Sequence, residues 1–469
     1  MKKTISLLTL SLCLSLHFIA FSQCMRKIAM FEGVYYITPS QEAMFWGVNP
    51  LGANKATPTV LRTGSFQNIY LGGKVCFLLD TQGTLWAGGY NGQGAFGIGN
   101  TNTYSSYVAL SGNYSGMKSL VLDDNYGAMI KADGSLWTWG ENTHYQIGDG
   151  TNFTRLNPVR IGTATDWKGL YYGAAAVIAQ KNNGQLWGWG ERLSGILTNN
   201  VSISDGGFVK IPSLLSSDTD WAKVAVGTNI ALAQKTSGVL WSWGGDDHGG
   251  IGRASATASA SIRFNPAPIN TDTDWKDFST LSHTSYAVKN NGTLWGWGDN
   301  GYGQLGNASG QNSWVPIQIG TDTDWDRVYA GTDFAMAVKT DGRIFTFGGV
   351  NYFGQLGNGT FNTTGPEEFY PNMYAINVPG CPYLDKPHFG IDQLLQVVNP
   401  FNDSLNLQYA PMDQAELLLY DNTGRLLSRS SLLPSGGTLQ IPTESWPQGL
   451  YLLQVNSQGK TLGSLKVVK

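Results

Sequence analysis

The sequence predicts an all-β protein: a seven-bladed β-propeller followed by a small immunoglobulin-like β-sandwich. Three observations predict this fold class. A Trp-rich motif recurs seven times at intervals of about 50 residues, glycine (60 residues) and aromatic residues (12%) are abundant, and the pattern changes near residue 390. Seven copies at this period fit a propeller or a solenoid. Many glycines together with many aromatics are typical of short strands joined by tight turns.

The first residues have the features of a secretory signal peptide. Two lysines follow the initiator Met, an apolar run occupies residues 5–21, and Ala20 and Ser22 supply a small-x-small end. We therefore expect residues 1–22 to be removed during export, leaving a mature chain without a transmembrane segment. Loss of the two lysines changes the net charge from −3 to −5, and only 13% of residues are charged. Nucleic acid is therefore not an expected partner.

The repeat is a hairpin whose second strand carries two aromatic residues, as in GTLWGWG at 292–298. Polar–Gly pairs such as Asp133-Gly134 precede the motif and are typical of type I′ turns. Aromatic residues two positions apart share one face of a strand, so each hairpin needs a neighbouring hairpin to cover that face. Residues expected to have this structural role are Trp86, Trp137, Trp139, Trp187, Trp189, Trp241, Trp243, Trp295, Trp297, Phe345 and Phe347.

These repeats resemble the regulator-of-chromosome-condensation repeat. The resemblance includes the segment after each motif, such as DNGYGQLGN at 299–307, and it implies a seven-bladed propeller over residues 25–380. It implies little about function, because one fold hosts unrelated activities. The first copy of the repeat starts directly at its hairpin strands, and the last copy ends with the segment that follows its proline, at 365–378. We therefore expect the two chain ends to meet within one blade.

Three cysteines remain after loss of the signal peptide. Cys24 and Cys381 lie just outside the two ends of the repeat region, whereas Cys76 occupies a column otherwise filled by small residues. The hypothesis is a Cys24–Cys381 disulfide with Cys76 free in the core. Its alternative is three free thiols.

A Pro-rich linker at 381–389 precedes a different pattern at 390–469, where alternating apolar residues predict an antiparallel sandwich. This segment resembles the type A C-terminal sorting domain of the type IX secretion system of Bacteroidetes. The resemblance implies passage through the periplasm and release, or attachment at the outer-membrane surface, by the type IX secretion machinery. An ordinary adhesion-type sandwich is the alternative. The residues that carry the resemblance are Asn399, Pro400, Phe401, Gly424, Gly449, Tyr451, Lys466, Val467, Val468 and Lys469.

No residue set predicts a catalytic, cofactor or metal site. His144 and His248 occupy equivalent loop positions, but no further His completes a metal set. The TDTDW segments at 271–275 and 321–325 pair two carboxylates, whereas calcium takes six to eight oxygens. We expect their Asp residues to cap turns and their Trp residues to pack between blades.

The predicted function is a secreted or cell-surface binding propeller without catalysis, acting as a monomer on an unknown extracellular protein or glycan. Residues 192–210 and 253–264 depart most from the repeat and are the candidate binding loops. The alternatives are an extracellular polymer-degrading or carbohydrate-binding protein and a propeller-type protein inhibitor. The sequence does not reveal whether carboxylates from separate blades meet in the axial channel.

Overall fold

The computed structural model describes most of the chain after residue 24. The described residues are 25–111, 114–173, 175–192, 195–197, 206–254, 262–307, 309–349, 351–362, 373–378, 395–397, 403–409, 415–421, 425–434, 437–457 and 460–469. The regular elements there are strands, which confirms the predicted all-β class. The chain divides into two compact units, Met1–Gly380 and Cys381–Lys469. None of the described residues forms a helix long and apolar enough to cross a membrane.

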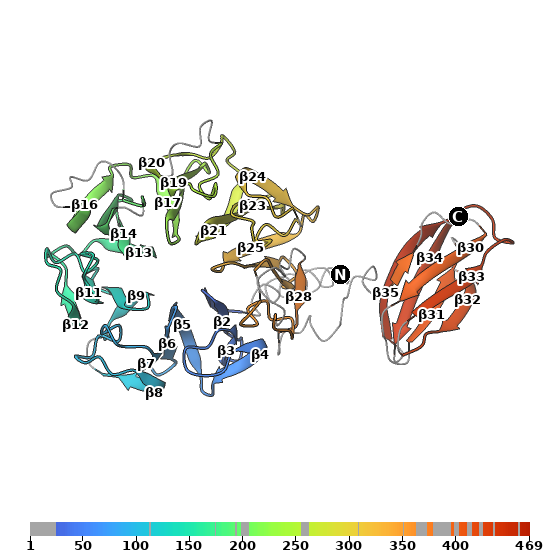
Figure 1. Ribbon diagram of the computed structural model, residues 1–469, viewed down its shortest axis with the longest axis horizontal. Coiled ribbons are helices and arrows are strands. Elements are labelled where there is room, and N and C mark those ends of the chain that lie inside the picture. The colour runs from blue at the N-terminus through green and yellow to red at the C-terminus, as the bar shows by residue number, and fades with distance from the viewer. Residues whose placement is uncertain are drawn as a thin grey trace, which may run out of the picture. The chain divides into compact units, whose positions relative to one another are not determined.

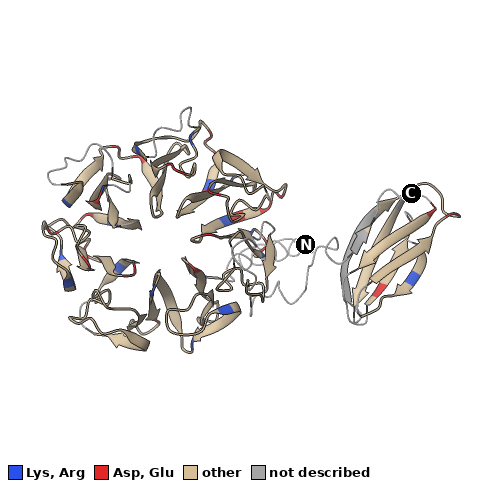
Figure 2. Ribbon diagram, in the orientation of Figure 1, with Lys and Arg blue, Asp and Glu red and all other residues tan. Residues whose placement is uncertain are grey.

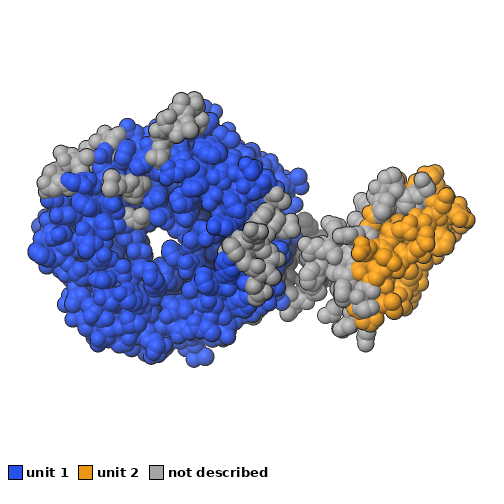
Figure 3. All heavy atoms as spheres, in the orientation of Figure 1, with its two compact units in different colours: residues 1–380 blue, residues 381–469 orange. Residues whose placement is uncertain are grey.

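The first unit contains seven four-stranded antiparallel sheets, each made of four consecutive strands. Figure 1 shows these blades in a ring, and Figure 3 shows the opening at its centre. The predicted seven-bladed propeller is therefore confirmed.

The blades are named here in chain order. Blade 1 contains β1 (Lys27–Met30), β2 (Gly33–Ile37), β3 (Ala43–Gly47) and β4 (Lys55–Arg62). Blade 2 contains β5 (Phe66–Gly72), β6 (Val75–Asp80), β7 (Leu85–Gly89) and β8 (Tyr104–Leu110). Blade 3 contains β9 (Met117–Leu122), β10 (Tyr126–Lys131), β11 (Leu136–Gly140) and β12 (Arg155–Arg160). Blade 4 contains β13 (Trp167–Gly173), β14 (Ala176–Lys181), β15 (Leu186–Glu191) and β16 (Phe208–Ser216).

The remaining blades follow the same order. Blade 5 contains β17 (Trp221–Val226), β18 (Ile230–Lys235), β19 (Leu240–Gly245) and β20 (Ile262–Pro268). Blade 6 contains β21 (Trp275–Leu281), β22 (Thr284–Lys289), β23 (Leu294–Gly298) and β24 (Ser313–Ile319). Blade 7 contains β25 (Trp325–Ala330), β26 (Ala335–Lys339), β27 (Ile344–Phe347) and β28 (Tyr374–Ile376).

The repeated motif forms the second and third strands of each blade. In blade 6, Trp295 pairs with Ala287 and Trp297 pairs with Ser285. Gly292 makes the turn between β22 and β23 with a φ of +79°, and a Cβ there would lie 2.0 Å from the Thr323 carbonyl oxygen. Only glycine fits this turn, because it is left-handed and the chain entering the next blade passes over it.

A hydrogen bond from an indole joins most pairs of neighbouring blades. The second Trp of the motif is fully buried, and its Nε1 donates to a backbone carbonyl in the loop of the preceding blade. A buried donor without an acceptor costs about 1–3 kcal/mol, so this bond fixes where the next blade can sit. The five bonds are Trp46 to Gln355 (2.9 Å), Trp139 to Ala95 (2.7 Å), Trp189 to Gln146 (2.8 Å), Trp243 to Ile196 (2.8 Å) and Trp297 to Gly250 (2.9 Å).

Two joints lack this Trp and are completed in other ways. Blade 2 has Gly88 at that position, and Leu51 from the preceding loop fills the space, 2.8 Å from where a Cβ would lie. Blade 7 has Phe347, which has no N–H to donate. There the Tyr286 hydroxyl donates to the Gln304 carbonyl instead (2.8 Å), and the Tyr286 ring lies edge-on to Phe347 at 5.8 Å.

The ring closes between blades and not within one, so the expectation that the chain ends share a blade was wrong. Blade 1 is built entirely from β1–β4 and blade 7 from β25–β28. Their joint uses the Trp46 bond, together with the amide of Thr332 donating to the Phe31 carbonyl (3.0 Å). Closure therefore repeats the contact between other neighbours, and it needs no exchanged strand.

The second unit has two antiparallel sheets around one core. One sheet has the order β29-β30-β33 and the other β32-β31-β34-β35. Leu407 from the first sheet and Leu419 and Leu453 from the second belong to the same buried cluster, so the sheets pack face to face. The immunoglobulin-like part of the fold stays a prediction. The strands are β29 (Leu395–Val397), β30 (Ser404–Tyr409), β31 (Ala415–Tyr420), β32 (Leu426–Ser431), β33 (Gly437–Pro442), β34 (Leu450–Ser457) and β35 (Lys460–Val468).

Candidate functional site

The blades give the propeller two faces with different connections. Because the strands alternate in direction, the turn after the first strand and the loop after the third strand open on one face, here called the mouth face. The turn after the second strand and the link to the next blade lie on the opposite face. First strands of successive blades, from β1 to β25, contact one another beside the channel.

Carboxylates from four blades gather on the mouth face around the channel. Glu32 lies in the turn between β1 and β2, Asp333 in the turn between β25 and β26, and Asp299 directly follows β23. Asp123 and Asp124 form the turn between β9 and β10. These five residues are called the acidic mouth below. Figure 2 shows acidic positions at the inner ends of several blades.

The electrostatics show that these carboxylates act on one another. Partial burial raises the pKa of Glu32, and the charges of Asp124 and Asp333 raise it further, against a smaller opposing effect of Lys74. Burial and then Asp299 raise the pKa of Asp333, against an opposing effect of His283. Carboxylates whose pKa values are raised by burial and by neighbouring carboxylates mark a candidate functional site.

The pKa of Asp123 is raised in the same way, first by burial and then by Asp124. Asp124 has a cationic neighbour in Lys74 (3.6 Å), but the Lys74 side chain is 71% exposed, so this pair contributes little. Among the described residues there is no group of three or more His, Cys, Asp or Glu that could hold a metal ion. The acidic mouth is thus a diffuse negative surface.

On the opposite face, aspartates of the TDTDW type are paired with lysine. The Lys289 ammonium lies 2.6 Å from Asp272 and 3.2 Å from Asp274, between the rings of Trp275 (4.7 Å) and Trp295 (5.0 Å). Four such sets, called lysine clamps below, are centred on Lys181, Lys235, Lys289 and Lys339. Their Trp residues lie edge-on to the motif aromatic of their own blade, for example Trp275 to Trp295 at 6.1 Å.

The mouth face also carries a histidine pair and exposed aromatic rings. The His248 ring, from the loop of blade 5, lies 4.7 Å from the His283 ring, from the first turn of blade 6, at an interplanar angle of 56°. Tyr302, Tyr352 and Phe353 lie in the loops of blades 6 and 7 and are 42%, 37% and 41% exposed. Sequence reasoning did not identify these three rings as a binding surface, although Tyr302 and Phe353 each precede a recurring Gly-Gln pair.

The structure places the predicted residues unevenly. The second aromatic of the motif is fully buried wherever it is present, and the first, as in Trp295, is half-buried. Cys76 is free and fully buried, and burial raises the pKa of its thiol to about 12. The signal peptide, Cys24 and Cys381 fall outside the described residues. His144 packs against Phe208 at 6.0 Å.

The two predicted binding loops are described in part, at residues 192, 195–197 and 206–210 of the first and at 253, 254 and 262–264 of the second. One contact joins them, because the Arg192 guanidinium lies 4.5 Å from the centre of the Phe264 ring. Arg192 follows β15 and Phe264 belongs to β20, so this contact joins blades 4 and 5.

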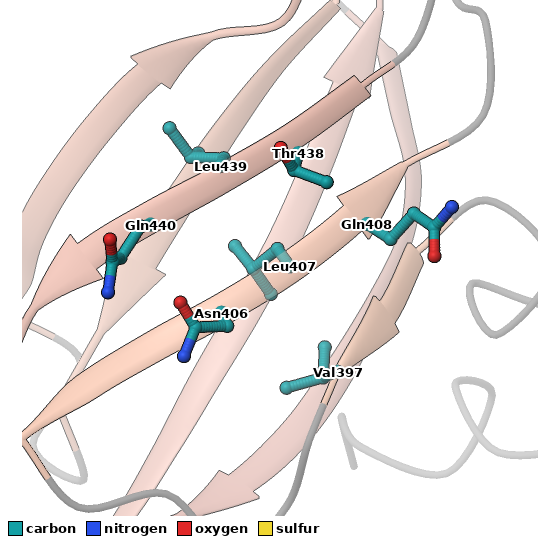
Figure 4. A pocket seen from close by; sticks show the side chains of 7 residues that line it. All are labelled: Val397, Asn406, Leu407, Gln408, Thr438, Leu439 and Gln440. Carbon is teal, nitrogen blue, oxygen red and sulfur yellow. The ribbon is translucent and has the colours of Figure 1, made fainter.

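The sorting residues lie in the second unit. Asn399, Pro400, Phe401 and Gly424 fall outside the described residues, and Lys466 and Val468 belong to β35. Val467 is buried in the core, whereas Gly449, Tyr451 and Lys469 meet at one end of the unit. A shallow cavity of about 490 Å³ on the outer face of β29, β30 and β33 is lined mainly by uncharged polar side chains, including Asn406, Gln408 and Gln440 (Figure 4).

Comparisons with family models agree with this architecture. Residues 133–174 and 291–338 match the Regulator of chromosome condensation (RCC1) repeat, and residues 399–469 match a Secretion system C-terminal sorting domain. The chain therefore carries RCC1 repeats and a type IX sorting domain, which indicates secretion or cell-surface localisation through type IX secretion.

Relatives and solved structures share the propeller. The chain is 24% identical over 271 residues to the E3 ubiquitin-protein ligase HERC2 of Mus musculus, covering 54% of this chain and 5% of HERC2. It is 25% identical to the mitochondrial RCC1 domain-containing protein RUG3 of Arabidopsis thaliana, covering 50% of this chain and 54% of RUG3. Yeast RCC1 (Prp20), in the crystal structure of Kap60 bound to it, superposes with a TM-score of 0.63 at 16% identity, over 79% of this chain and 87% of that chain. Human WBSCR16 gives 0.58 at 16% identity, over 71% and 89%.

Proposed function

We propose that the protein is an exported binding propeller whose acidic mouth binds a cationic segment of an extracellular protein. The observation that carries this proposal is the convergence of Glu32, Asp123, Asp124, Asp299 and Asp333 from four blades, with raised pKa values for three of them. Charges that repel one another cost folding free energy. Local hydrogen bonds hold Asp124, from the Lys74 amide, and Asp299, from the Gly301 amide and Gln304 Nε2. The pKa values of Glu32, Asp123 and Asp333 nevertheless stay raised. A lysine- or arginine-rich ligand would relieve this repulsion.

The rest of the chain has supporting roles in this proposal. The propeller at 25–380 is a rigid scaffold, and its buried motif aromatics hold seven blades in register. The segment at 381–389 links it to the sorting domain at 390–469, which directs export after removal of residues 1–22. The protein acts as a monomer without catalysis, and a propeller-type inhibitor would be one form of this activity. The Cys24–Cys381 disulfide stays a hypothesis, for which intact mass without reduction is the test.

A second candidate function, carbohydrate binding, is favoured by the exposed rings of Tyr302, Tyr352 and Phe353 on the same face. Aromatic rings present a rigid apolar surface with a polar edge, which suits a sugar ring as well as a protein. Removing these rings while keeping the carboxylates separates the two functions. The double variant Tyr302→Ala/Tyr352→Ala should lose glycan-array binding if the ligand is a glycan and keep most of its protein capture if it is not.

The proposal is tested by capture of extracellular proteins followed by carboxyl-to-amine crosslinking. A zero-length reagent that joins carboxylates to lysines should link the partner to Glu32 or Asp333. The variant Glu32→Gln/Asp333→Asn should lose both the crosslinks and at least tenfold in affinity, the effect of about 1.4 kcal/mol.

The matched control is Glu42→Gln/Asp133→Asn, which removes the same charge from turns on the opposite face and should bind like the natural chain. Crosslinks confined to other carboxylates, or equal losses in the two variants, would reject the acidic mouth as the binding site.

A further inference from the structure

One end of the sorting domain contains a pocket that none of the preceding assignments uses. Its volume is about 320 Å³, and its walls come from three separate stretches of the second unit. These stretches are the two ends of the turn between β31 and β32, the segment before β34, and β34 itself. The lining residues are Asp421, Arg425, Leu427, Ser445, Trp446, Pro447, Gln448, Gly449 and Tyr451.

The aromatic wall of the pocket is held in place by hydrogen bonds. The Tyr451 hydroxyl donates to the Pro447 carbonyl at 2.6 Å, and its ring lies 5.1 Å from the Trp446 ring. Lys469 anchors the same segment, because its Nζ donates to the Trp446 carbonyl (2.9 Å) and its backbone pairs with Gly449 in both directions (3.0 and 3.2 Å). The wall is therefore formed before any partner arrives, which reduces the entropic cost of binding.

A positive charge stands beside this wall. The Arg425 side chain is 76% exposed, and its Nε donates to Asp421 Oδ2 at 3.1 Å. The Arg425 amide also donates to Asp421 Oδ1, and the Asp421 amide donates to the Arg425 carbonyl, both at 3.0 Å. The Asp421 side chain is only 17% exposed. One edge of the guanidinium is thus held by Asp421 while the rest faces solvent, an arrangement suited to a second carboxylate.

We propose that this pocket is the surface by which the type IX secretion machinery recognises the folded sorting domain. Its occupant is a segment of the machinery that gives a carboxylate to Arg425 and an apolar side chain to the Trp446–Tyr451 wall. Arg, Trp and Tyr are the residues that most often dominate binding energy at interfaces. Three residues that carry the sequence resemblance build or support this wall: Gly449 directly precedes β34, Tyr451 lies on β34, and Lys469 directly follows β35.

The cavity on the outer face of β29, β30 and β33 serves as a comparison for this pocket. Its amides bond to a neighbour on the same face, since Asn406 Nδ2 and Gln440 Nε2 both donate to the Ser404 hydroxyl at 3.1 Å. It has no charged residue and no aromatic ring among its lining side chains (Figure 4). It offers a partner neither a charge nor a large apolar anchor.

The test is export of the full chain from a bacterium that uses type IX secretion, measured as the ratio of exported to periplasmic protein. Arg425→Gln and Arg425→Glu should each lower this ratio at least about tenfold, the factor for loss of one charge-assisted hydrogen bond. Arg425→Lys should recover part of it, and Gln440→Glu on the amide face should leave it unchanged.

Folding is checked on purified protein by its unfolding midpoint, which the exposed Arg425 should not alter. Normal export of Arg425→Gln and Arg425→Glu, or an equal loss in Gln440→Glu, would overturn the proposal. Recognition of the sorting domain through this pocket does not depend on what the propeller binds. A purified Arg425→Gln protein should still bind the propeller's partner, so failure of one proposal leaves the other testable.

Discussion

The acidic mouth and the lysine clamps both contain carboxylate side chains, but they lie on opposite faces of one propeller. At a clamp, two aspartates bind an ammonium that is fixed between two aromatic rings, as at Lys289, whose side chain is 11% exposed. At the mouth, the charges of Asp124 and Asp333 raise the pKa of Glu32, and the charge of Asp299 raises that of Asp333. The clamps recur in four consecutive blades, whereas the mouth has no repeat. The recurring clamps stabilise the fold, whereas the irregular acidic mouth is an electrostatic cost that the fold tolerates.

The pKa shifts of the clamp lysines and of the mouth carboxylates also differ in their causes. Burial alone would lower the pKa of Lys235 and Lys289, but hydrogen bonds and charges from their aspartates outweigh it, so both values are raised. The clamp charges therefore stabilise each other. At the mouth, burial and like charges act in the same direction on Glu32, Asp123 and Asp333, so ionisation opposes folding there.

Breaking a clamp should have the largest effect on stability. We expect Lys289→Met to lower the unfolding free energy by about 1–2 kcal/mol, because two half-exposed carboxylates lose their cation and two rings lose a cation–π contact. Urea unfolding measures the change. Lys168→Met, on an exposed position of β13, is the control and should cost less than about 0.5 kcal/mol. Equal costs would remove the distinction between clamp and surface lysines.

Neutralising the mouth should have the opposite sign. Glu32→Gln/Asp333→Asn should raise the unfolding free energy at pH 7 by about 0.5–1 kcal/mol, the usual gain from relieving charge repulsion. The same urea experiment applies. A loss of stability in this variant would show that the mouth carboxylates are structural.

The pH dependence sharpens this result. A carboxylate with a raised pKa in the folded state contributes stability below its unfolded pKa of about 4 and loses that contribution as the pH rises through the folded value. Thermal unfolding from pH 4 to pH 8 should therefore show the advantage of Glu32→Gln/Asp333→Asn growing with pH. Asp133 should behave in the opposite way, because hydrogen bonds from Ser135 lower its pKa. A constant advantage over this range would contradict the raised values.

Completing the weakest clamp should give the smallest effect. Lys181 has one aspartate, Asp166 at 3.0 Å, because Ala164 stands where the other clamps have Asp. Ala164→Asp should add a few tenths of a kcal/mol, up to about 1 kcal/mol, for a half-exposed pair. Thr163→Asp adds the same charge one position away and should add nothing. Equal gains would attribute the effect to net charge.

The structural features that recur along the chain could be predicted from the sequence. The W-x-W pattern correctly indicated a ring of mutually covering hairpins, and Trp297 is fully buried as that requires. The clamps could also have been predicted, because a lysine equivalent to Lys289 ends the second strand of blades 3 to 7. The replacement of Trp by Gly88 was harder to interpret, because its complement, Leu51, belongs to another blade.

The acidic mouth could not be predicted from the sequence, because it forms only when the ring closes. Glu32 and Asp333 are 301 positions apart in the sequence, and they approach each other only because the joint between blades 1 and 7 brings their turns to one mouth. No local pattern encodes that approach. The expectation of a shared blade failed for a related reason: four consecutive strands complete each sheet, so closure falls between blades.

The central claim is that the mouth carboxylates serve a ligand and the clamp carboxylates serve the fold. Titration calorimetry of the mature protein with a lysine-rich peptide tests it most directly, using the natural chain, Glu32→Gln/Asp333→Asn and the control Glu42→Gln/Asp133→Asn. The account predicts binding that weakens with added salt, is lost at least tenfold in the mouth variant and is unchanged in the control. Equal affinity for all three proteins would contradict it.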